Sequence, residues 1–233
     1  MGFVLKNQKI MDGEPMSAFF LLLIVAYLLG SIPFGLVVAK FMGGPDPRLA
    51  GSGNIGAANV YRLLGRNAGA FTLFGDIMKG AVPVFLARFG LTGLGAWHEG
   101  AVAAVGLAAV VGHIWPLYLG FKGGKAVATS FGVVMVVAPL AAAVLAGLYA
   151  LIFRRWRISA VASLATAWAL PPVIGLLSPV KIYLLLGAIL SALILWRHQD
   201  NIIRLCREQE PELAAGAKEA WAQNGSAAKP SAG

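Results

Sequence analysis

Six long apolar runs determine what this chain can fold into. They are residues 17–41, 68–89, 100–119, 126–153, 159–177 and 182–196. Each is near or above the length of about 20 residues that crosses the hydrocarbon core of a bilayer. Backbone groups in that core must satisfy their own hydrogen bonds, so the runs predict an all-α, polytopic integral membrane protein. With 58% hydrophobic and 12% charged residues, the chain also lacks the polar surface of a soluble domain.

The two ends of the chain differ in composition from its apolar centre. Residues 1–15 are polar and lack the layout of a cleaved signal peptide, so we expect an N-terminal extension, with Met16 as an alternative start. Residues 16–210 form the expected membrane domain. Residues 211–233, rich in Ala, Gly, Lys, Glu and Pro, form the expected disordered cytoplasmic tail. The lone Cys206 excludes an intramolecular disulfide and suggests a reducing compartment.

The distribution of Lys and Arg predicts which loops face the cytoplasm. The formal net charge is +9, but the basic residues lie in short loops without interleaved aromatic residues, which argues against nucleic-acid binding. Four clusters are expected to share one side of the membrane. They are Lys40, Arg48, Arg62 and Arg66; Lys122 and Lys125; Arg154, Arg155 and Arg157; and Arg197, Arg204 and Arg207.

The apolar run 126–153 decides the number of crossings. Lys125 and Arg154 share a side only if the chain between them crosses the membrane an even number of times. We therefore predict two short or partly re-entrant helices hinged at Ala138 and Pro139. This prediction gives seven transmembrane helices, with the N-terminus outside and the C-terminus cytoplasmic. The alternative is one tilted helix and six crossings, which would put three arginines on the opposite side.

The first loop that predicts chemistry is residues 51–62, GSGNIGAANVYR. Its glycines let backbone N–H groups approach a ligand closely, its serine and asparagines add uncharged donors, and its arginine is a forked cation suited to phosphate. The candidate substrate-binding residues are Ser52, Gly53, Asn54, Asn59 and Arg62. The glycines also match G-x-G-x-x-G, but that motif needs a preceding strand, so a dinucleotide site is excluded. A Gly-rich packing turn remains the alternative.

The second segment, residues 112–126, contains GHIWP and FKGGKA. Gly123 and Gly124 precede Lys125 as in the end of a P-loop, but Ala126 stands where a Mg²⁺-binding hydroxyl would be, so nucleotide hydrolysis is not supported. A lysine at a helix start beside glycines is still a suitable phosphate clamp. His113, close to Trp115, is interpreted as a residue of the membrane interface rather than as a ligand.

The third segment is residues 196–204, WRHQDNIIR. His198 and Asn201 are three residues apart, so a continuing helix would present them on one face, where an imidazole beside an amide can orient or deprotonate a hydroxyl. The alternative is a basic stop-transfer flank, a role that we assign to Arg197, Arg204 and Arg207.

Three polar residues lie inside the apolar runs. Asp76 and Lys79 are spaced so that they can pair on one helix, and a functional site and a structural ion pair are equally compatible with them. Ser163 lies near the start of the run 159–177, where a hydroxyl more often bonds its own backbone than a ligand.

These segments together resemble the bacterial acyl-phosphate:glycerol-3-phosphate acyltransferase family, the PlsY type, over residues 16–210. The matching stretches, in the family's order, are residues 30–35, 51–62, 75–80, 112–116, 121–129 and 198–202. Departures are Ala58, where the family commonly has Thr, Ala126, where it usually has Gly, and Gln199, where Arg is common. These departures put a phosphate contact at positions 58 and 199 in doubt.

The resemblance implies a reaction and a site. A fatty acyl group passes from acyl phosphate to the 1-hydroxyl of glycerol 3-phosphate, which gives lysophosphatidate and phosphate, the first acylation of phospholipid synthesis. The enzyme is expected to be a monomer in the bacterial cytoplasmic (inner) membrane, with its active site facing the cytoplasm and no cofactor or metal. The active site is implied to contain Ser52, Arg62, Lys125, Ser163, His198 and Asn201.

The chemistry of the two substrates agrees with these residues. Acyl phosphate is already activated, so positioning and charge stabilisation suffice without a covalent nucleophile. Either His198, aligned by Asn201, or a phosphate oxygen of the substrate can take the proton of the attacking hydroxyl. The chain has no H-x-x-x-x-D pair of the thioester-dependent acyltransferases. A transporter for a phosphate-bearing solute is the alternative function, although no internal repeat supports it, and a membrane scaffold would leave the Gly-rich cationic loops unexplained.

Overall fold

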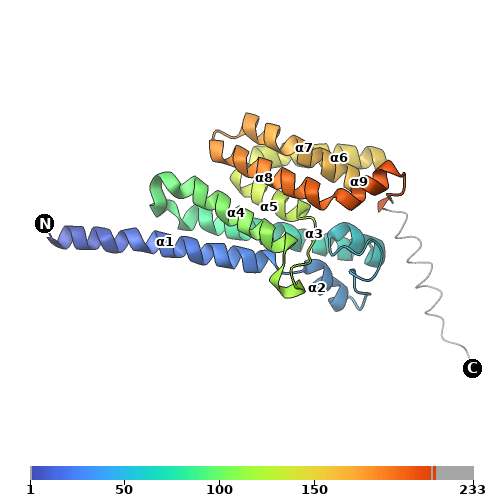
Figure 1. The fold of residues 1–233 in the computed structure, drawn as a ribbon, viewed down its shortest axis with the longest axis horizontal. Coiled ribbons are helices and arrows are strands. Elements are labelled where there is room, and N and C mark those ends of the chain that lie inside the picture. The colour runs from blue at the N-terminus through green and yellow to red at the C-terminus, as the bar shows by residue number, and fades with distance from the viewer. Residues whose placement is uncertain (1, 211, 214–233) are drawn as a thin grey trace, which may run out of the picture.

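The computed structural model describes residues 2–210, 212 and 213, and for residues 2–14 the backbone alone. Within these residues the chain forms helices and no strands, so the predicted all-α class is confirmed. Figure 1 shows the long helices running side by side as a bundle, with the N-terminal part of α1 extending beyond it at one end and with α2 and α9 at the other.

Nine α-helices and two short 3₁₀ helices follow one another in the described part of the chain. They are α1 (Gly2–Gly30), α2 (Phe34–Phe41), α3 (Ala57–Gly90), η1 (Thr92–Trp97), α4 (His98–Ile114), η2 (Leu117–Leu119), α5 (Val127–Val137), α6 (Pro139–Trp156), α7 (Ser159–Leu177), α8 (Lys181–Arg197) and α9 (Gln199–Cys206).

The structure describes the two predicted chain ends only in part. Helix α1 begins at Gly2 and continues through Pro15, so the backbone has no break between the predicted N-terminal extension and the membrane domain. Of the predicted C-terminal tail, residues 211 and 214–233 lie outside the described residues. The backbone N–H of Leu213 donates a 3.0 Å hydrogen bond to the carbonyl of Arg157, which holds this point of the chain against the end of α6.

The first apolar run does not form the single helix that its length suggests. It is divided into α1 and α2, which meet at 45°. Pro33 causes the break, because it lacks an N–H and disfavours helical geometry in Ile32. The carbonyl of Ile32 instead accepts a 2.8 Å hydrogen bond from Nζ of Lys79 on α3. The break therefore creates an acceptor that a buried lysine uses.

The predicted hinge in the run 126–153 is confirmed. Helix α5 ends at Val137, Ala138 leaves helical geometry with φ −147° and ψ 70°, and Pro139 begins α6. A proline is favourable at the first position of a helix, because the N–H that it lacks would have no partner there. The 11 residues of α5 are about 16 Å long at about 1.5 Å per residue, well short of the hydrocarbon core of about 30 Å.

The number of crossings stays a prediction. By length and apolar composition, four of the described helices can cross a membrane. The number rises to at most six if each of two bent helix pairs counts as one span. The bent pairs are α1 with α2 and α8 with α9. Seven crossings additionally require the short α5 to count as a span.

Small residues bring α5 close to α3 and so position the loop that precedes α5. A Cβ atom added to Gly132 would lie 2.0 Å from the carbonyl oxygen of Ile77, and one added to Gly80 would lie 2.2 Å from that of Thr129. Glycine is therefore required at both positions, since any side chain would push the two helices apart. Gly65, with φ 83°, interrupts α3 between its first two turns and its long apolar part.

Candidate active site

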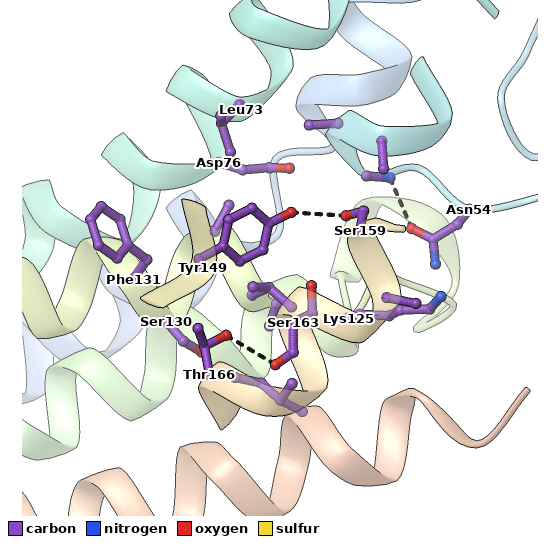
Figure 2. A pocket seen from close by; sticks show the side chains of 18 of the residues that line it. Asn54, Leu73, Asp76, Lys125, Ser130, Phe131, Tyr149, Ser159, Ser163 and Thr166 are labelled. Atoms are coloured by element: carbon purple, nitrogen blue, oxygen red, sulfur yellow. Dashed lines mark hydrogen bonds between the residues drawn. The ribbon is translucent and has the colours of Figure 1, made fainter. Parts of the chain in front are cut away.

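A single cavity of about 580 Å³ receives residues from all three loops that the sequence singled out. The predicted site residues that line it are Ser52, Asn54, Asn59, Arg62, Lys125, Ser163, His198 and Asn201. Gly53, Gly123 and Gly124 are not among the residues lining it. The close-up in Figure 2 shows Asn54, Lys125 and Ser163 around this cavity, with Asp76 and Tyr149 beside them.

The cavity changes character along the helices that form it. Its arginines and its lysine come from loops and helix starts, such as Arg62 and Lys125. Further along the same helices the lining becomes apolar, with Leu73 and Ile77 on α3, Phe131 and Val134 on α5, Leu145 on α6 and Leu170 on α7. A charged headgroup could therefore bind in the polar part of the cavity, with an attached aliphatic chain in the adjoining apolar part.

Asn59 organises the first loop. Its side chain is 1% exposed and its Oδ1 accepts a 2.8 Å hydrogen bond from the backbone N–H of Ser52. Its Nδ2 group lies 2.9–3.1 Å from three carbonyl oxygens, those of Pro47, Ala50 and Asn54. Asn59 thus holds the loop in shape from within, although the sequence suggested that it contacts substrate.

Glycine is needed where this loop folds over Asn59. Gly51 has φ +61°, and a Cβ atom added to it would lie 2.3 Å from Oδ1 of Asn59. Gly53 also lies in the left-handed region, with φ +68°. The start of α3 is fixed by Asn54, whose Oδ1 accepts a 2.9 Å hydrogen bond from the backbone N–H of Gly56 (Figure 2). The loop thus has a defined structure. Arg62, which follows it on α3 and is 9% exposed, lines the cavity.

The loop before α5 is held from two sides. The backbone N–H groups of Gly123 and Gly124 each donate a 3.1 Å hydrogen bond, to the carbonyls of Ile114 and His113 at the end of α4. From α8, Arg197 donates through Nη2 to the carbonyl of Gly123 at 2.9 Å and through Nε to that of Gly124 at 3.2 Å. The two glycines thus shape the loop, and Lys125 is the loop residue that enters the cavity.

Lys125 is half-buried, and its Nζ donates a hydrogen bond to Oδ1 of Asn201. Burial lowers the pKa of Lys125 from its ordinary value of 10.5 to about 8, because removing the ammonium from water disfavours its charged form. The carboxylate of Glu210 favours the charged form and the guanidinium of Arg204 disfavours it. Lys125 therefore loses its charge as the pH rises through about 8.

His198 lies at the junction of α8 and α9, which meet at 56°. The expectation of one continuing helix is therefore wrong. His198 and Asn201 nevertheless both belong to the first turn of α9, where the backbone N–H of Ile202 donates a 2.9 Å hydrogen bond to the carbonyl of His198. Nδ1 of His198 lies 2.8 Å from the carbonyl oxygen of Ile194. A carbonyl only accepts, so Nδ1 carries the proton and Nε2 of the neutral ring keeps its lone pair. The ring can thus accept a proton at Nε2.

Glu210 completes this side of the site, and sequence reasoning missed it. Its Oε1 accepts a 2.7 Å hydrogen bond from Nδ2 of Asn201, and its Oε2 accepts one of 2.7 Å from Nε of Arg204. Arg204, expected only as part of a basic flank, is thus paired with a carboxylate that lines the cavity. No motif marks Glu210, since it lies beyond α9 and only the return of the chain brings it to Asn201.

Ser163 enters the cavity from α7 and is 5% exposed. The hydroxyl that bonds the α7 backbone is that of Thr166, whose Oγ1 donates to the carbonyls of Ala162 at 2.8 Å and Ser163 at 3.1 Å. Nearby, the hydroxyls of Tyr149 and Ser159 lie 2.9 Å apart and join α6 to α7 across the cavity wall (Figure 2). Tyr149 and Ser159 are further lining residues that the sequence did not indicate.

A buried polar cluster adjoins the cavity. Lys79 Nζ lies 2.9 Å from Oδ1 of Asp76, so the predicted pairing is confirmed. Nδ1 of His113 lies 3.7 Å from the same carboxylate and 3.0 Å from Oγ1 of Thr129. His113 is only 4% exposed, so its interpretation as an interfacial residue is wrong: the packing of α4 turns it inward to Asp76 and Thr129. Asp76 and His113 both line the cavity.

Known proteins resemble this chain over most of its length. A family model described as glycerol-3-phosphate acyltransferase matches residues 20–208. The glycerol-3-phosphate acyltransferase of Syntrophotalea carbinolica is 42% identical over 200 residues, which cover 86% of this chain and 100% of that protein. The enzyme of the same name from Myxococcus xanthus is 44% identical over 189 residues, covering 81% of this chain and 96% of that one.

The fold is shared with two crystal structures of PlsY (YgiH), an integral membrane glycerol 3-phosphate acyltransferase. The glycerol 3-phosphate form has a TM-score of 0.77 and 39% identity, and the lysophosphatidic acid form has 0.76 and 38%. Each comparison covers 84% of this chain and 95% of the other. A family match over most of the chain, these identities and the common membrane fold agree, and the chain belongs to the glycerol-3-phosphate acyltransferase family.

Proposed function

We propose that this protein transfers a fatty acyl group from acyl phosphate to the 1-hydroxyl of glycerol 3-phosphate and releases lysophosphatidate and phosphate. The observation that carries the proposal is the single cavity in which Arg62 and Lys125 adjoin an apolar lining. A related enzyme has been solved in a glycerol 3-phosphate form and in a lysophosphatidic acid form. These two names describe an acceptor and a product of such a transfer.

The charges of the substrates explain the cations of the site. Two phosphate monoester-like groups together carry about four negative charges near neutral pH. In our proposal Arg62, Lys125 and Ser52 bind these groups, because a guanidinium, an ammonium and a hydroxyl all donate to phosphate oxygens. The backbone of the loop that Gly53, Asn54 and Asn59 shape would wrap the acyl phosphate, and Gly123 and Gly124 would set the position of Lys125.

The reaction needs a base and a place for the leaving group. The hydroxyl oxygen of glycerol 3-phosphate attacks the acyl carbonyl carbon, and phosphate leaves with the electron pair of the broken C–O bond. The hydroxyl proton passes to Nε2 of His198 or to a phosphate oxygen of a substrate, both of which can accept it. Asn201 aligns the site by joining Lys125 to Glu210. Ser163 is assigned a hydrogen bond to the substrate, since it lines the same cavity.

The acyl chain and the orientation complete the proposal. The acyl chain would lie along the apolar lining formed by α3, α5, α6 and α7. The protein would be a monomer in the bacterial inner membrane, with seven crossings, its N-terminus outside and the site at the cytoplasmic face. Supporting this orientation, Arg154 and Arg155 lie in the last turn of α6 and Arg157 follows it, at the end of the bundle where Leu213 returns to Arg157.

A direct assay tests the function. Purified protein in detergent receives palmitoyl phosphate and labelled glycerol 3-phosphate without CoA or added metal, and lysophosphatidate is measured. We expect product that depends on both substrates and on protein concentration. Palmitoyl-CoA replaces palmitoyl phosphate in a parallel arm. Product from the thioester alone would overturn the proposed donor, and product from neither donor would overturn the proposed reaction.

A further inference from the structure

We propose that Arg197 is a positioning residue that locks the Lys125 loop to the helix junction at His198. The proposal rests on the proposed function, since it concerns the same site. The basic residues after the last apolar run were assigned to membrane orientation, and charge alone would satisfy that role. Arg197 instead makes two directed hydrogen bonds, to the carbonyl oxygens of Gly123 and Gly124.

The two carbonyls belong to a loop whose N–H groups are already used. Gly123 and Gly124 donate to the carbonyls of Ile114 and His113, so the loop is fastened to the end of α4. Within the described residues, Arg197 is the group that bonds the opposite edge of the loop. The loop is therefore a bridge between α4 and α8, and the guanidinium is its attachment on the α8 side.

The close packing of the loop explains why this attachment sets a position. A Cβ atom added to Gly124 would lie 2.3 Å from Nε2 of His113, and one added to Gly123 would lie 2.1 Å from the carbonyl oxygen of His113. The loop is thus pressed against α4 on one side and held by Arg197 on the other. Lys125 follows directly, and its Nζ reaches Asn201 on α9. A shift of the loop would move this ammonium relative to Asn201.

Aromatic contacts restrain the guanidinium itself. Arg197 Cζ lies 5.5 Å from the ring centroid of Trp196, and that ring lies 5.6 Å from the ring of Trp115, just beyond α4. The same two helix ends that the loop bridges are therefore also joined by the contact between these two tilted rings. Arg197 immediately precedes His198, so one residue couples the cationic loop to the junction that carries the imidazole.

The conservative substitution Arg197→Lys separates positioning from orientation. Lysine keeps the positive charge that sets membrane orientation, but its ammonium is a point charge and cannot reproduce the planar fork that bonds two adjacent carbonyls. Arg207→Lys is the matched control, because Arg207 is exposed and does not line the cavity. Arg197→Gln and Arg207→Gln complete the set by removing the charge at each position.

We expect Arg197→Lys and Arg197→Gln to lower kcat/KM by about 10- to 100-fold, because displacing a binding group by about 1 Å has effects of this size. KM for glycerol 3-phosphate or palmitoyl phosphate should rise, while the Arg207 variants stay within about twofold of the wild type. A merely structural role would reduce the active fraction and lower the apparent kcat with both KM values unchanged. That pattern, or wild-type kinetics in Arg197→Lys, would overturn the proposal.

A second measurement does not depend on activity. Acetylation of Lys125 is followed by peptide mass spectrometry in all five proteins, with exposed Lys122 as the internal reference. We expect Lys125 to be acetylated faster in the two Arg197 variants than in the wild type, because the loop no longer holds Lys125 against Asn201. In the Arg207 variants, the rate should equal that of the wild type. Equal rates in all five proteins would overturn the positioning role. An inactive wild type would contradict the proposed reaction but leave this comparison valid.

Discussion

Nζ of Lys125 donates a hydrogen bond to Oδ1 of Asn201, a residue 76 positions further along the chain. The contact joins the loop before α5 to α9, which carry separate sequence motifs, and Ser52 and Arg62 from a third motif line the same cavity. Cationic, amide and imidazole groups from three parts of the chain therefore meet at one place.

The cations Arg62 and Lys125 are expected to be essential for activity. Arg62→Ala and Lys125→Ala should each lower kcat/KM by about 100-fold or more, the size of effect seen when a charge-stabilising donor is removed from an active site. Lys122→Ala is the control, because Lys122 is exposed near the same loop and does not line the cavity. Near-normal turnover by either alanine variant, with unchanged thermal unfolding in detergent, would contradict the assigned phosphate clamp.

The half-buried Lys125 predicts an alkaline limit to activity. Its pKa is lowered to about 8 by burial, so the ammonium is present below that pH and is lost as pH rises through it. The pH profile of kcat/KM, which reports the free enzyme, should therefore fall above about pH 8. Lys125→Arg should be slower but should lose this fall, because a guanidinium stays charged. An unchanged alkaline fall in Lys125→Arg would assign it to another group.

The imidazole of His198 is predicted to act on the chemical step. His198→Ala should lower kcat by about 100-fold with a smaller change in KM, as expected when a general base is removed. His98→Ala serves as the control, since His98 lies at the start of α4 and its Nε2 is 3.0 Å from the carbonyl oxygen of Arg88, away from the cavity lining. A raised KM with unchanged kcat would make His198 a binding residue, and the substrate phosphate would then be the base.

Asn59 is predicted to support the first loop rather than to contact substrate. Asn59→Ala would remove the partner of the Ser52 N–H and of the carbonyls of Pro47 and Asn54, at a cost of about 1–3 kcal/mol per buried group left unsatisfied. The carbonyl of Ala50 would keep its hydrogen bond from the N–H of Gly53. We expect a lower unfolding temperature together with lost activity. Exposed Asn67→Ala, on the same helix, should change neither. Lost activity with full thermal stability would instead support substrate contact.

Asp76 and Lys79 are predicted to stabilise the protein only when both side chains are present. Asp76→Asn leaves the Lys79 charge buried without its carboxylate, which should destabilise the protein by about 3–5 kcal/mol. The double variant Asp76→Asn with Lys79→Met should be less destabilised than the sum of the two single variants. Thermal unfolding in detergent measures the stability of the two single variants and of the double variant. Additive effects would show that the two side chains do not interact.

The local properties of the sequence were sufficient to predict the framework of membrane helices. Apolar length predicts membrane helices because backbone groups cannot stay unpaired in lipid, and the proline at 139 predicts the break before α6 because it cannot continue a helix. Proline had the same effect at Pro33, where the apolar length of the run concealed the break between α1 and α2. The candidate loops were identifiable because glycines, amides and cations occur together in them along the chain.

What each polar side chain does was decided by tertiary structure alone. Asn59 turns inward to its own loop, His113 is buried against Thr129, and Glu210 returns to Asn201. Arg197 shows the difference most directly, since its charge is readable from its position but its two carbonyl partners are not. Composition and spacing report on neighbours along the chain, whereas a hydrogen-bond partner depends on which helix packs alongside. Small residues such as Gly80 and Gly132 set part of that packing, because they let α3 and α5 approach closely.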